Sequence, residues 1–404
     1  MNEIRTVACI GDSITFAPSM AIFGVTEPWV DQLTAALERT ARPRRGDGFR
    51  GLWRDDEWAQ SGSWTQPETA DPFDVAPFRR GLYSSGCAAD ELVWIKPATL
   101  TVHAFDIYSF PVPGAGGWQY RVDDGPWSDI PEPRAVNHDK IHRHSVDQPV
   151  GQQVTIRGHD GSAPRVAPVM GIETFSTSTE GVVVHNLGHQ LQTLTQFCRA
   201  SAGDPLALLD ELRPDLVVVM FSNDVLFRNP DRFAHAIEAL VARVAPYADV
   251  LLMTPFEQRT DRCVDDALTT AGSTELISPS ALFTVTDEGK SIHGTNIAIG
   301  TQIRRVHSVE RVTMTAAATG ASSHGELMVA SKRDRALQAS YRAVTRATAE
   351  ALGCPMLDLA DAWQASVGAG WDAAYAAGLM SDGLHPNQNG HDDIAKRVIE
   401  ALGL

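Results

Sequence analysis

The stretch that decides the fold is CIGDSITFA, residues 9–17. It overlaps an apolar segment, Arg5 to Ile10, that has the character of a buried strand, and WVDQLTAAL at 29–37 then carries apolar residues at helical spacing. The Gly-Asp-Ser triplet therefore stands between a predicted strand and a predicted helix. Because Gly, Asp and Ser are also common turn and helix-capping residues, the triplet alone establishes no function.

The bulk composition excludes some classes of protein. Of 404 residues, 43% are hydrophobic and 21% charged, as is usual for a soluble globular protein. No apolar run approaches the roughly 20 residues that span a bilayer. The first predicted strand begins too early for a secretory signal peptide to precede it. We therefore expect no membrane insertion and no classical secretion.

Charge and cysteine content narrow the partners further. The formal net charge of -16 argues against a nucleic-acid partner, because phosphate binding needs clustered Lys and Arg. The cysteines are odd in number and form no CxxC motif, so neither a disulfide framework nor a zinc site is indicated; they are Cys9, Cys87, Cys198, Cys263 and Cys354. We expect no metal and no cofactor.

Composition and the pattern of apolar residues divide the sequence into three predicted structural units. Strand and helix patterns alternate over 1–45, 181–256 and 331–404, which predicts one catalytic α/β domain with a parallel sheet covered on both faces. Residues 46–180 are rich in Trp, Gly and Pro with short alternating segments, which predicts an inserted β-sandwich of a carbohydrate-binding kind. Residues 257–330 alternate Thr, Val and Ile with Gly-containing turns, which predicts a second, small β module.

Four polar stretches fall where a parallel sheet places its functional loops, beyond the carboxyl ends of its strands. They are GDS at 11–13, NLG at 186–188, SND at 222–224 and SDGLHPNQNGH at 381–391.

These four blocks, in this order, resemble those of the SGNH (GDSL-like) hydrolase family through Ser13, Gly188, Asn223 and His385. The resemblance covers about half the chain and implies a flavodoxin-like three-layer hydrolase domain. It also implies that Ser13 is the nucleophile, that His385 is the general base and that Asp382 orients the imidazole. The oxyanion hole is implied to consist of the N–H groups of Ser13 and Gly188 and the side-chain amide of Asn223.

The chemistry of these residue types agrees with the implied roles. A serine hydroxyl needs a base to accept its proton, and histidine suits that task at neutral pH. An Asp three residues before the His can bond the far ring nitrogen. One departure is Phe221, where the family usually has Gly, and it is expected to alter the local backbone and narrow the acyl site.

Each residue also has a structural interpretation. Ser13 and Asn223 are possible caps, Gly188 a turn glycine and His385 a loop histidine, while Asp12 and Asp224 are better explained as capping or supporting residues. The histidines of NHDKIHRH at 137–144 match no metal-site spacing, which favours a solvated loop. The six tryptophans of the first insertion are either a stacking platform for sugars or ordinary core; they are Trp53, Trp58, Trp64, Trp94, Trp118 and Trp127.

The predicted function is removal of a short acyl group, acetyl in particular, from a carbohydrate or cell-envelope glycan. No apolar lid helix flanks the four blocks, and the Trp-rich insertion is suited to hold a glycan. The segment from Phe283 resembles a β module of actinobacteriophage tail proteins, which implies that the protein belongs to a virion tail. Its oligomeric state is left open. The alternatives are a cytoplasmic esterase, an acyltransferase acting on a sugar hydroxyl, and a non-catalytic glycan-binding tail protein.

Overall fold

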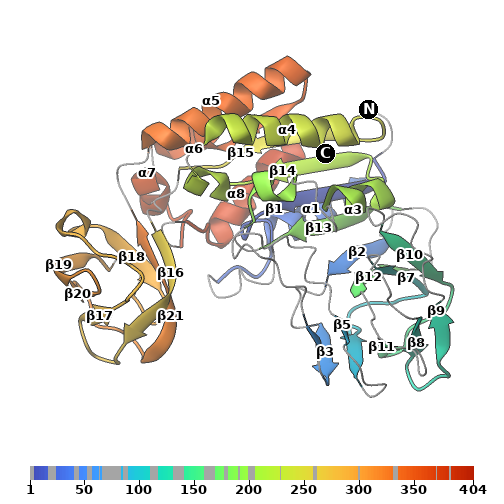
Figure 1. Cartoon of the computed structure of the whole chain (residues 1–404). Helices are drawn as coiled ribbons and strands as arrows, with labels where there is room; N and C mark the ends of the chain where they lie inside the picture. The colour runs from blue at the N-terminus through green and yellow to red at the C-terminus, as the bar shows by residue number, and fades with distance from the viewer. Residues whose placement is uncertain are drawn as a thin grey trace.

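Figure 1 shows the computed structural model of the whole chain. The structure describes residues 4–16, 24–40, 45–51, 57–62, 64–65, 83–84, 90–109, 117–130, 141–158, 169–176, 181–189, 192–198, 205–227, 229–257, 262–298, 301–330, 335–369, 371–381 and 384–404.

A five-stranded parallel sheet forms the centre of the α/β domain. Its strand order is β13-β1-β14-β15-β22, the doubly wound order of flavodoxin-like folds. The strands are β1 (Thr6–Gly11), β13 (Val183–Gly188), β14 (Leu216–Met220), β15 (Asp249–Thr254) and β22 (Met356–Asp358). The predicted fold class, a parallel α/β domain interrupted by antiparallel β sheets, is confirmed.

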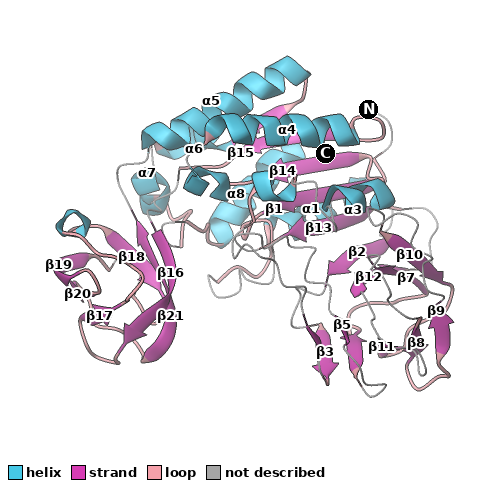
Figure 2. Ribbon diagram, viewed as in Figure 1, coloured by secondary structure: helices cyan, strands magenta, loops and turns pink. Residues whose placement is uncertain are grey.

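Helices cover both faces of this sheet, as Figure 2 shows. One face packs against α2 (Leu194–Phe197), α3 (Pro205–Leu212), α4 (Pro230–Val244) and α5 (Arg335–Leu352). The other packs against α1 (Trp29–Thr40), α6 (Leu359–Val367), α7 (Trp371–Ala376) and α8 (Gln388–Ala401). Strand β1 therefore alternates apolar side chains between two cores, with Ala8 and Ile10 in the first and Val7 and Cys9 in the second.

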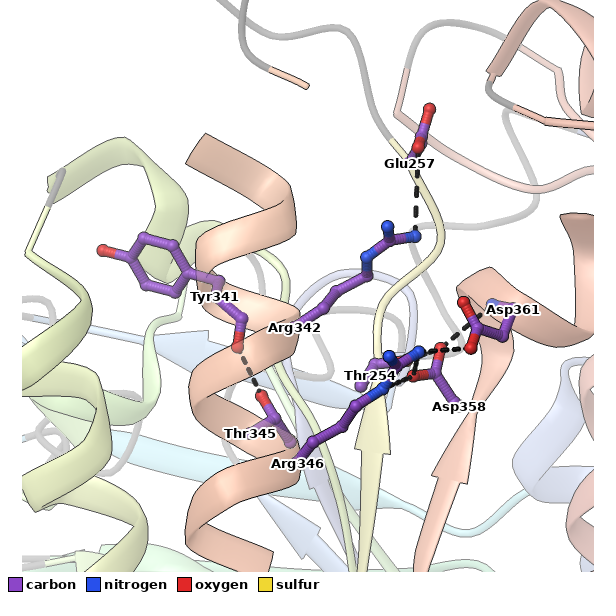
Figure 3. A network of polar contacts seen from close by, with 8 residues as sticks. All are labelled: Thr254, Glu257, Tyr341, Arg342, Thr345, Arg346, Asp358 and Asp361. Atoms are coloured by element: carbon purple, nitrogen blue, oxygen red, sulfur yellow. Dashed lines mark hydrogen bonds and ion pairs between the residues drawn. The ribbon is translucent and has the colours of Figure 1, made fainter. Parts of the chain in front are cut away.

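A network of charged side chains joins α5 to the carboxyl ends of two strands (Figure 3). Arg346 donates to Asp358 at 2.6 Å and pairs with Asp361. Thr254, at the end of β15, donates its hydroxyl to Asp358 at 2.8 Å, and Asp358 caps α6 by accepting from the N–H of Asp361. Because Asp358 ends β22 and begins α6, this network fixes the edge of the sheet to the helices on either side.

The first β unit consists of two antiparallel sheets that pack face to face. One sheet has the order β10-β7-β12-β2 and the other β3-β6-β11-β8-β9, with a shared apolar core between them. The strands are β2 (Gly46–Gly51), β3 (Trp58–Ser61), β6 (Glu91–Ile95), β7 (Ala104–Ser109), β8 (Trp118–Val122), β9 (Ser128–Ile130), β10 (His142–Val146), β11 (Gln153–Gly158) and β12 (Val169–Phe175); β4 (Trp64–Thr65) and β5 (Tyr83–Ser84) pair separately.

The tryptophans of this unit are mostly core residues. Trp94 and Trp118 are completely buried, and Trp58 and Trp64 pack against the same core. Trp127 lies beneath two guanidinium groups, those of Arg121 and Arg157, at 4.7 and 3.8 Å from its ring centroid. Trp53 lies outside the described residues. Trp94 and Trp118 are therefore ordinary core residues and do not form a platform for stacking sugars.

The first β unit packs directly on the α/β domain. Strand β2 lies beside β13, and the N–H of Phe49 donates to Nδ1 of His185 at 3.0 Å. Tyr108 donates to Glu173 at 2.6 Å, and Glu173 lies 3.9 Å from Nε2 of His185. Burial raises the pKa of Glu173 to about 7 and lowers that of His185 to about 3. A buried set of titratable groups therefore joins the two parts.

The second β unit is a small sheet with its own core. Its strand order is β18-β21-β16-β17-β20-β19, and the bridge between Ser291 and Gln302 brings its two outermost segments together. The strands are β16 (Arg262–Thr269), β17 (Glu275–Ile277), β18 (Ser291–Gly294), β19 (Ile303–Ser308), β20 (Arg311–Met314) and β21 (Ser322–Ala330), with a short helix η4 (Val285–Asp287). The predicted boundaries 46–180 and 257–330 enclose the strands of the two units and stay predictions.

Candidate active site

The predicted nucleophile and base lie in contact at the carboxyl edge of β1. Oγ of Ser13 is 3.1 Å from Nε2 of His385, although 372 positions separate the two residues. Each residue is 8% exposed. A hydroxyl at this distance from an imidazole nitrogen can pass its proton to the ring, which is the geometry that a serine nucleophile requires.

Ser13 lies in a tight turn, residues 12–16, which we call the nucleophile turn. The N–H groups of Thr15 and Phe16 both donate to the carbonyl of Asp12, at 3.1 and 3.0 Å. The preceding residue, Gly11, packs so closely on β14 that a Cβ there would lie 2.4 Å from the carbonyl oxygen of Met220. Glycine is therefore required where β1 enters the turn.

The side chain of Asp12 connects the nucleophile turn to the end of β14. Its carboxylate accepts from the N–H of Ile14 at 3.1 Å and from the N–H of Ser222 at 2.7 Å, and also from the Ser222 hydroxyl. Burial raises the pKa of Asp12, while these hydrogen bonds and the nearby His385 act in the opposite direction. Asp12 therefore supports the turn, as expected from the sequence.

His385 is held by the loop that precedes α8. Its carbonyl accepts from both the N–H and the hydroxyl of Ser381, each at 2.9 Å. Asn387 then caps α8 by accepting from the N–H of Gly390 at 3.2 Å. Asp382 lies outside the described residues, so its role in orienting His385 stays a prediction.

Asn223 starts the short helix η3 (Asn223–Phe227) immediately after β14. Its side-chain amide donates to the carbonyl of Gln192 at 3.3 Å and is 5% exposed. Among the described residues this bond uses one of the two amide hydrogens, and donation of the other to an oxyanion stays a prediction. The side chain is thus held at the same edge of the sheet as Ser13.

Asp224 fastens the segment that follows β13. Its carboxylate accepts from the N–H groups of Leu194 and Thr195 at 2.6 and 3.0 Å and from the Thr195 hydroxyl at 2.7 Å. Tyr341 of α5 donates to its carbonyl at 2.8 Å. Burial raises the pKa of Asp224 to about 6, against these hydrogen bonds. Asp224 is a supporting residue, as the sequence predicts.

Gly188 ends β13 against the nucleophile turn. A Cβ at this position would lie 2.5 Å from the nitrogen of Phe16 and 2.6 Å from the carbonyl carbon of Thr15, so close approach to the turn requires glycine. Its N–H donates to Oδ1 of Asn186 at 3.0 Å. The predicted donation from Gly188 to an oxyanion stays a prediction, and in this structure the side chain of Asn186 accepts that hydrogen.

Phe221 belongs to the apolar core. Its ring is 3% exposed, and its centroid lies 6.0 Å from that of Phe197. The ring contacts described for it lie in the core on the α2 side of the sheet, and the narrowing of an acyl site stays a prediction.

Sequence reasoning missed a second histidine near the site. His391 is completely buried in the first turn of α8, where Nδ1 accepts from the N–H of Trp29 at 3.3 Å. Burial, with a smaller contribution from His385, lowers its pKa to about 4, so it is neutral at pH 7. Its position six residues after His385 in HPNQNGH was the available signal.

The described residues contain no cluster of three or more His, Cys, Asp or Glu side chains that would hold a metal ion. His142 and His144 lie on β10 of the first β unit, whereas His138 lies outside the described residues. Within the same described part of the chain, no helix is both long enough and apolar enough to cross a membrane.

Comparison with known proteins places this fold beside an esterase. The structure described as "Peptidoglycan O-acetylesterase in action" matches with a TM-score of 0.56 and 14% sequence identity, over 99% of this chain and 91% of that chain. At this identity the likeness concerns the fold alone, which is a parallel α/β sheet with inserted antiparallel β sheets.

More distant matches add little. A GDSL-like lipase structure from Bacteroides ovatus matches with a TM-score of 0.29 and 10% identity, over 86% of this chain and 96% of that chain, and no argument rests on it. No family model matches the sequence. No curated protein matches it either.

Proposed function

We propose that the protein is a serine esterase of the SGNH type that removes short acyl groups, acetyl in particular, from a carbohydrate of the cell envelope. The observation that carries the proposal is the 3.1 Å contact between Oγ of Ser13 and Nε2 of His385 at the carboxyl edge of a doubly wound sheet. In such sheets ligands bind at this edge, where the strand order reverses. Here β1 lies between β13 and β14, and the contact is at that reversal.

In the first half of the reaction, Oγ of Ser13 attacks the carbonyl carbon of the ester while Nε2 of His385 accepts its proton. The resulting oxyanion accepts hydrogen bonds from the N–H of Ser13 and from the side chain of Asn223. Collapse breaks the bond to the sugar oxygen, which takes the proton from His385 and leaves as an alcohol. Ser13 then carries the acyl group.

In the second half, water replaces the sugar. His385 accepts a proton from water as the oxygen attacks the acyl carbon, and then returns it to Oγ of Ser13 as the carboxylic acid leaves. A sugar hydroxyl in place of water would give acyl transfer by the same steps.

The glycan substrate is supported by two features. The likeness to the peptidoglycan O-acetylesterase structure extends over 99% of the chain and therefore includes the β units. The first β unit also packs on β13, the strand that leads to Gly188. The virion-tail setting has no support among the comparisons; it stays a prediction and is not part of this proposal.

The first test is hydrolysis of 4-nitrophenyl acetate, butyrate and octanoate at pH 7–8 by the wild type and by Ser13→Ala. We expect turnover that decreases with chain length and disappears in the variant. Acetate release from O-acetylated peptidoglycan and from O-acetylated xylan then identifies the carbohydrate, and transfer of acetyl to an added sugar measures the transferase alternative. If the wild type is inert on every ester and Ser13 does not react with a serine-directed phosphonate, the catalytic proposal is wrong and a binding protein is favoured.

A further inference from the structure

We propose that Asn186, on β13, is a positioning residue that fixes the nucleophile turn from the neighbouring strand. The inference rests on the proposed function and concerns the same site. No role for Asn186 follows from the resemblance described above, which involves Gly188 in this segment.

The side chain of Asn186 makes one hydrogen bond in each direction. Nδ2 donates to the carbonyl of Thr15 at 2.8 Å, and Oδ1 accepts from the N–H of Gly188 at 3.0 Å. The residue is 6% exposed. These partners fix the orientation of the amide, because an exchange of its nitrogen and oxygen would place a donor against an N–H and an acceptor against a carbonyl.

The contact with Thr15 acts on a part of the nucleophile turn that the hydrogen bonds described for the Asp12 side chain do not include. The Asp12 side chain fastens the start of the turn to Ser222 on the β14 side. The end of the turn is fastened by Asn186 on the β13 side. Ser13 therefore lies between two anchors, one from each strand that flanks β1.

The sheet register places Asn186 correctly for this contact. In the parallel pairing of β1 with β13, Asn186 lies opposite Cys9 and Gly188 lies opposite Gly11. Strand β13 therefore reaches the turn exactly where β1 ends, and Gly188 allows its backbone to touch Thr15 and Phe16. The hydrogen bond within residues 186–188 orients the Asn186 amide, and its Nδ2 then joins this end of β13 to the turn.

The consequence for catalysis concerns the direction of Oγ. The position of Ser13 relative to His385 and Asn223 depends on the backbone of a turn of five residues, and a shift of about 1 Å in such a geometry can cost on the order of 100-fold in rate. Asn186 also accepts the N–H of Gly188, one of the three predicted oxyanion donors, so in this arrangement the proposed mechanism relies on the other two, the N–H of Ser13 and the side-chain amide of Asn223.

The test compares two substitutions at 186 with a matched control. Asn186→Ala removes both hydrogen bonds, whereas Asn186→Asp, assayed at pH 8, retains an acceptor for Gly188 and removes the donor to Thr15. Asn229→Ala is the control, because Asn229 likewise accepts from a backbone N–H, that of Arg232 at 3.1 Å, at the start of α4. The measurements are kcat and KM on 4-nitrophenyl acetate and the rate at which a serine-directed phosphonate reacts with Ser13, after circular dichroism has shown that each variant is folded.

We expect both Asn186 variants to lose about 10- to 100-fold in kcat and a similar factor in the phosphonate rate, with KM changed by less than about threefold. Asn229→Ala should keep both rates. If Asn186→Ala does not fold, Asn186→Asp decides. Either folded variant with a kcat within twofold of the wild type overturns the inference and leaves the proposed function intact, whereas an inert wild type overturns the proposed function and this inference with it.

Discussion

Asp12 and Ser222 are joined by two hydrogen bonds, because the buried carboxylate of Asp12 accepts both the N–H and the hydroxyl of Ser222. The residue before the nucleophile is thereby fastened to the residue before Asn223. The adjacent strands β1 and β14 thus share one polar anchor at the edge where the site lies. Its strength is open to measurement, because the hydroxyl can be removed without altering the backbone.

Ser222→Ala should lower the free energy of unfolding by about 2 kcal/mol, because a buried carboxylate loses one donor. Chemical denaturation measures the change. Ser366→Ala is the control, since the Ser366 hydroxyl donates to the carbonyl of Ala362 on the exposed side of α6, and a loss below about 0.5 kcal/mol is expected there. Equal losses of unfolding free energy in the two variants would show that the hydrogen bond from Ser222 to Asp12 stabilises the fold no more than an exposed hydroxyl does.

Asn223→Ala should reduce kcat by about 100- to 1,000-fold, because it removes a side-chain donor to the oxyanion. The melting temperature should change little, since the only described bond of this amide is the 3.3 Å contact with Gln192. Steady-state kinetics and a thermal melt of the same sample separate the two effects. A kcat within tenfold of the wild type would exclude Asn223 from the oxyanion hole.

The pH dependence of stability should carry a contribution from Glu173. Its pKa is raised to about 7 in the folded protein, first by burial, against about 4.3 in an unfolded chain. Between these values the folded state binds more protons, so the free energy of unfolding falls as the pH rises from about 4 to 7 and changes no further above 7.

Thermal melts at pH 5, 6, 7 and 8 test this contribution. Between pH 5 and 7 the slope for Glu173→Gln should be less negative than for the wild type, because glutamine does not titrate and its oxygen still accepts from Tyr108, whereas the opposite contribution of His185 is present in both proteins. Asp124→Asn, at an exposed position of the same β unit, should follow the wild-type curve. Identical slopes for all three proteins would rule out Glu173 as the source.

Asp358 combines a helix cap with an ion pair, and two substitutions separate them. Asp358→Ala should cost about 1–2 kcal/mol, because α6 loses its cap as well as the partner of Arg346. Asp358→Asn retains a capping oxygen and should cost less than about 1 kcal/mol, since Arg346 is 44% exposed and such pairs are weak in water. Urea titration of both variants provides the comparison, and nearly equal losses in the two variants would make the ion pair the larger contribution.

Much of the α/β domain follows from sequence pattern. The apolar run before Gly11 and the periodicity of residues 29–37 predict β1 and α1, because burial on both faces of a parallel strand and on one face of a helix leaves a clear spacing. Because parallel strands end at the same edge of a sheet, the sequence also predicts that Ser13 and Asn223 lie on one side of it, and the structure places them there. The 3.1 Å contact with His385 needed the fold, because 372 positions separate the two residues.

The hydrogen bonds that support the site could not be predicted from the sequence pattern. Asn186 and Ser222 act through hydrogen bonds between neighbouring strands, and only the register determines that Nδ2 of Asn186 reaches Thr15. His391 carries no periodic signal of its own, because its burial results from packing of α8 against the start of α1. For Gly188, glycine itself was predicted, but the competing acceptor on Asn186 depends on side-chain geometry.

The first and last strands of each β unit are direct neighbours. Strand β2 pairs with β12, and the N–H of Ser176 donates to the carbonyl of Arg45 at 2.7 Å; Arg262 at the start of β16 is opposite Val329 near the end of β21. Each unit thus leaves the α/β domain and returns to it at nearly the same point. A unit connected in this way interrupts the α/β domain at a single point of its chain, so the order and register of the parallel strands do not depend on the length of what is inserted there.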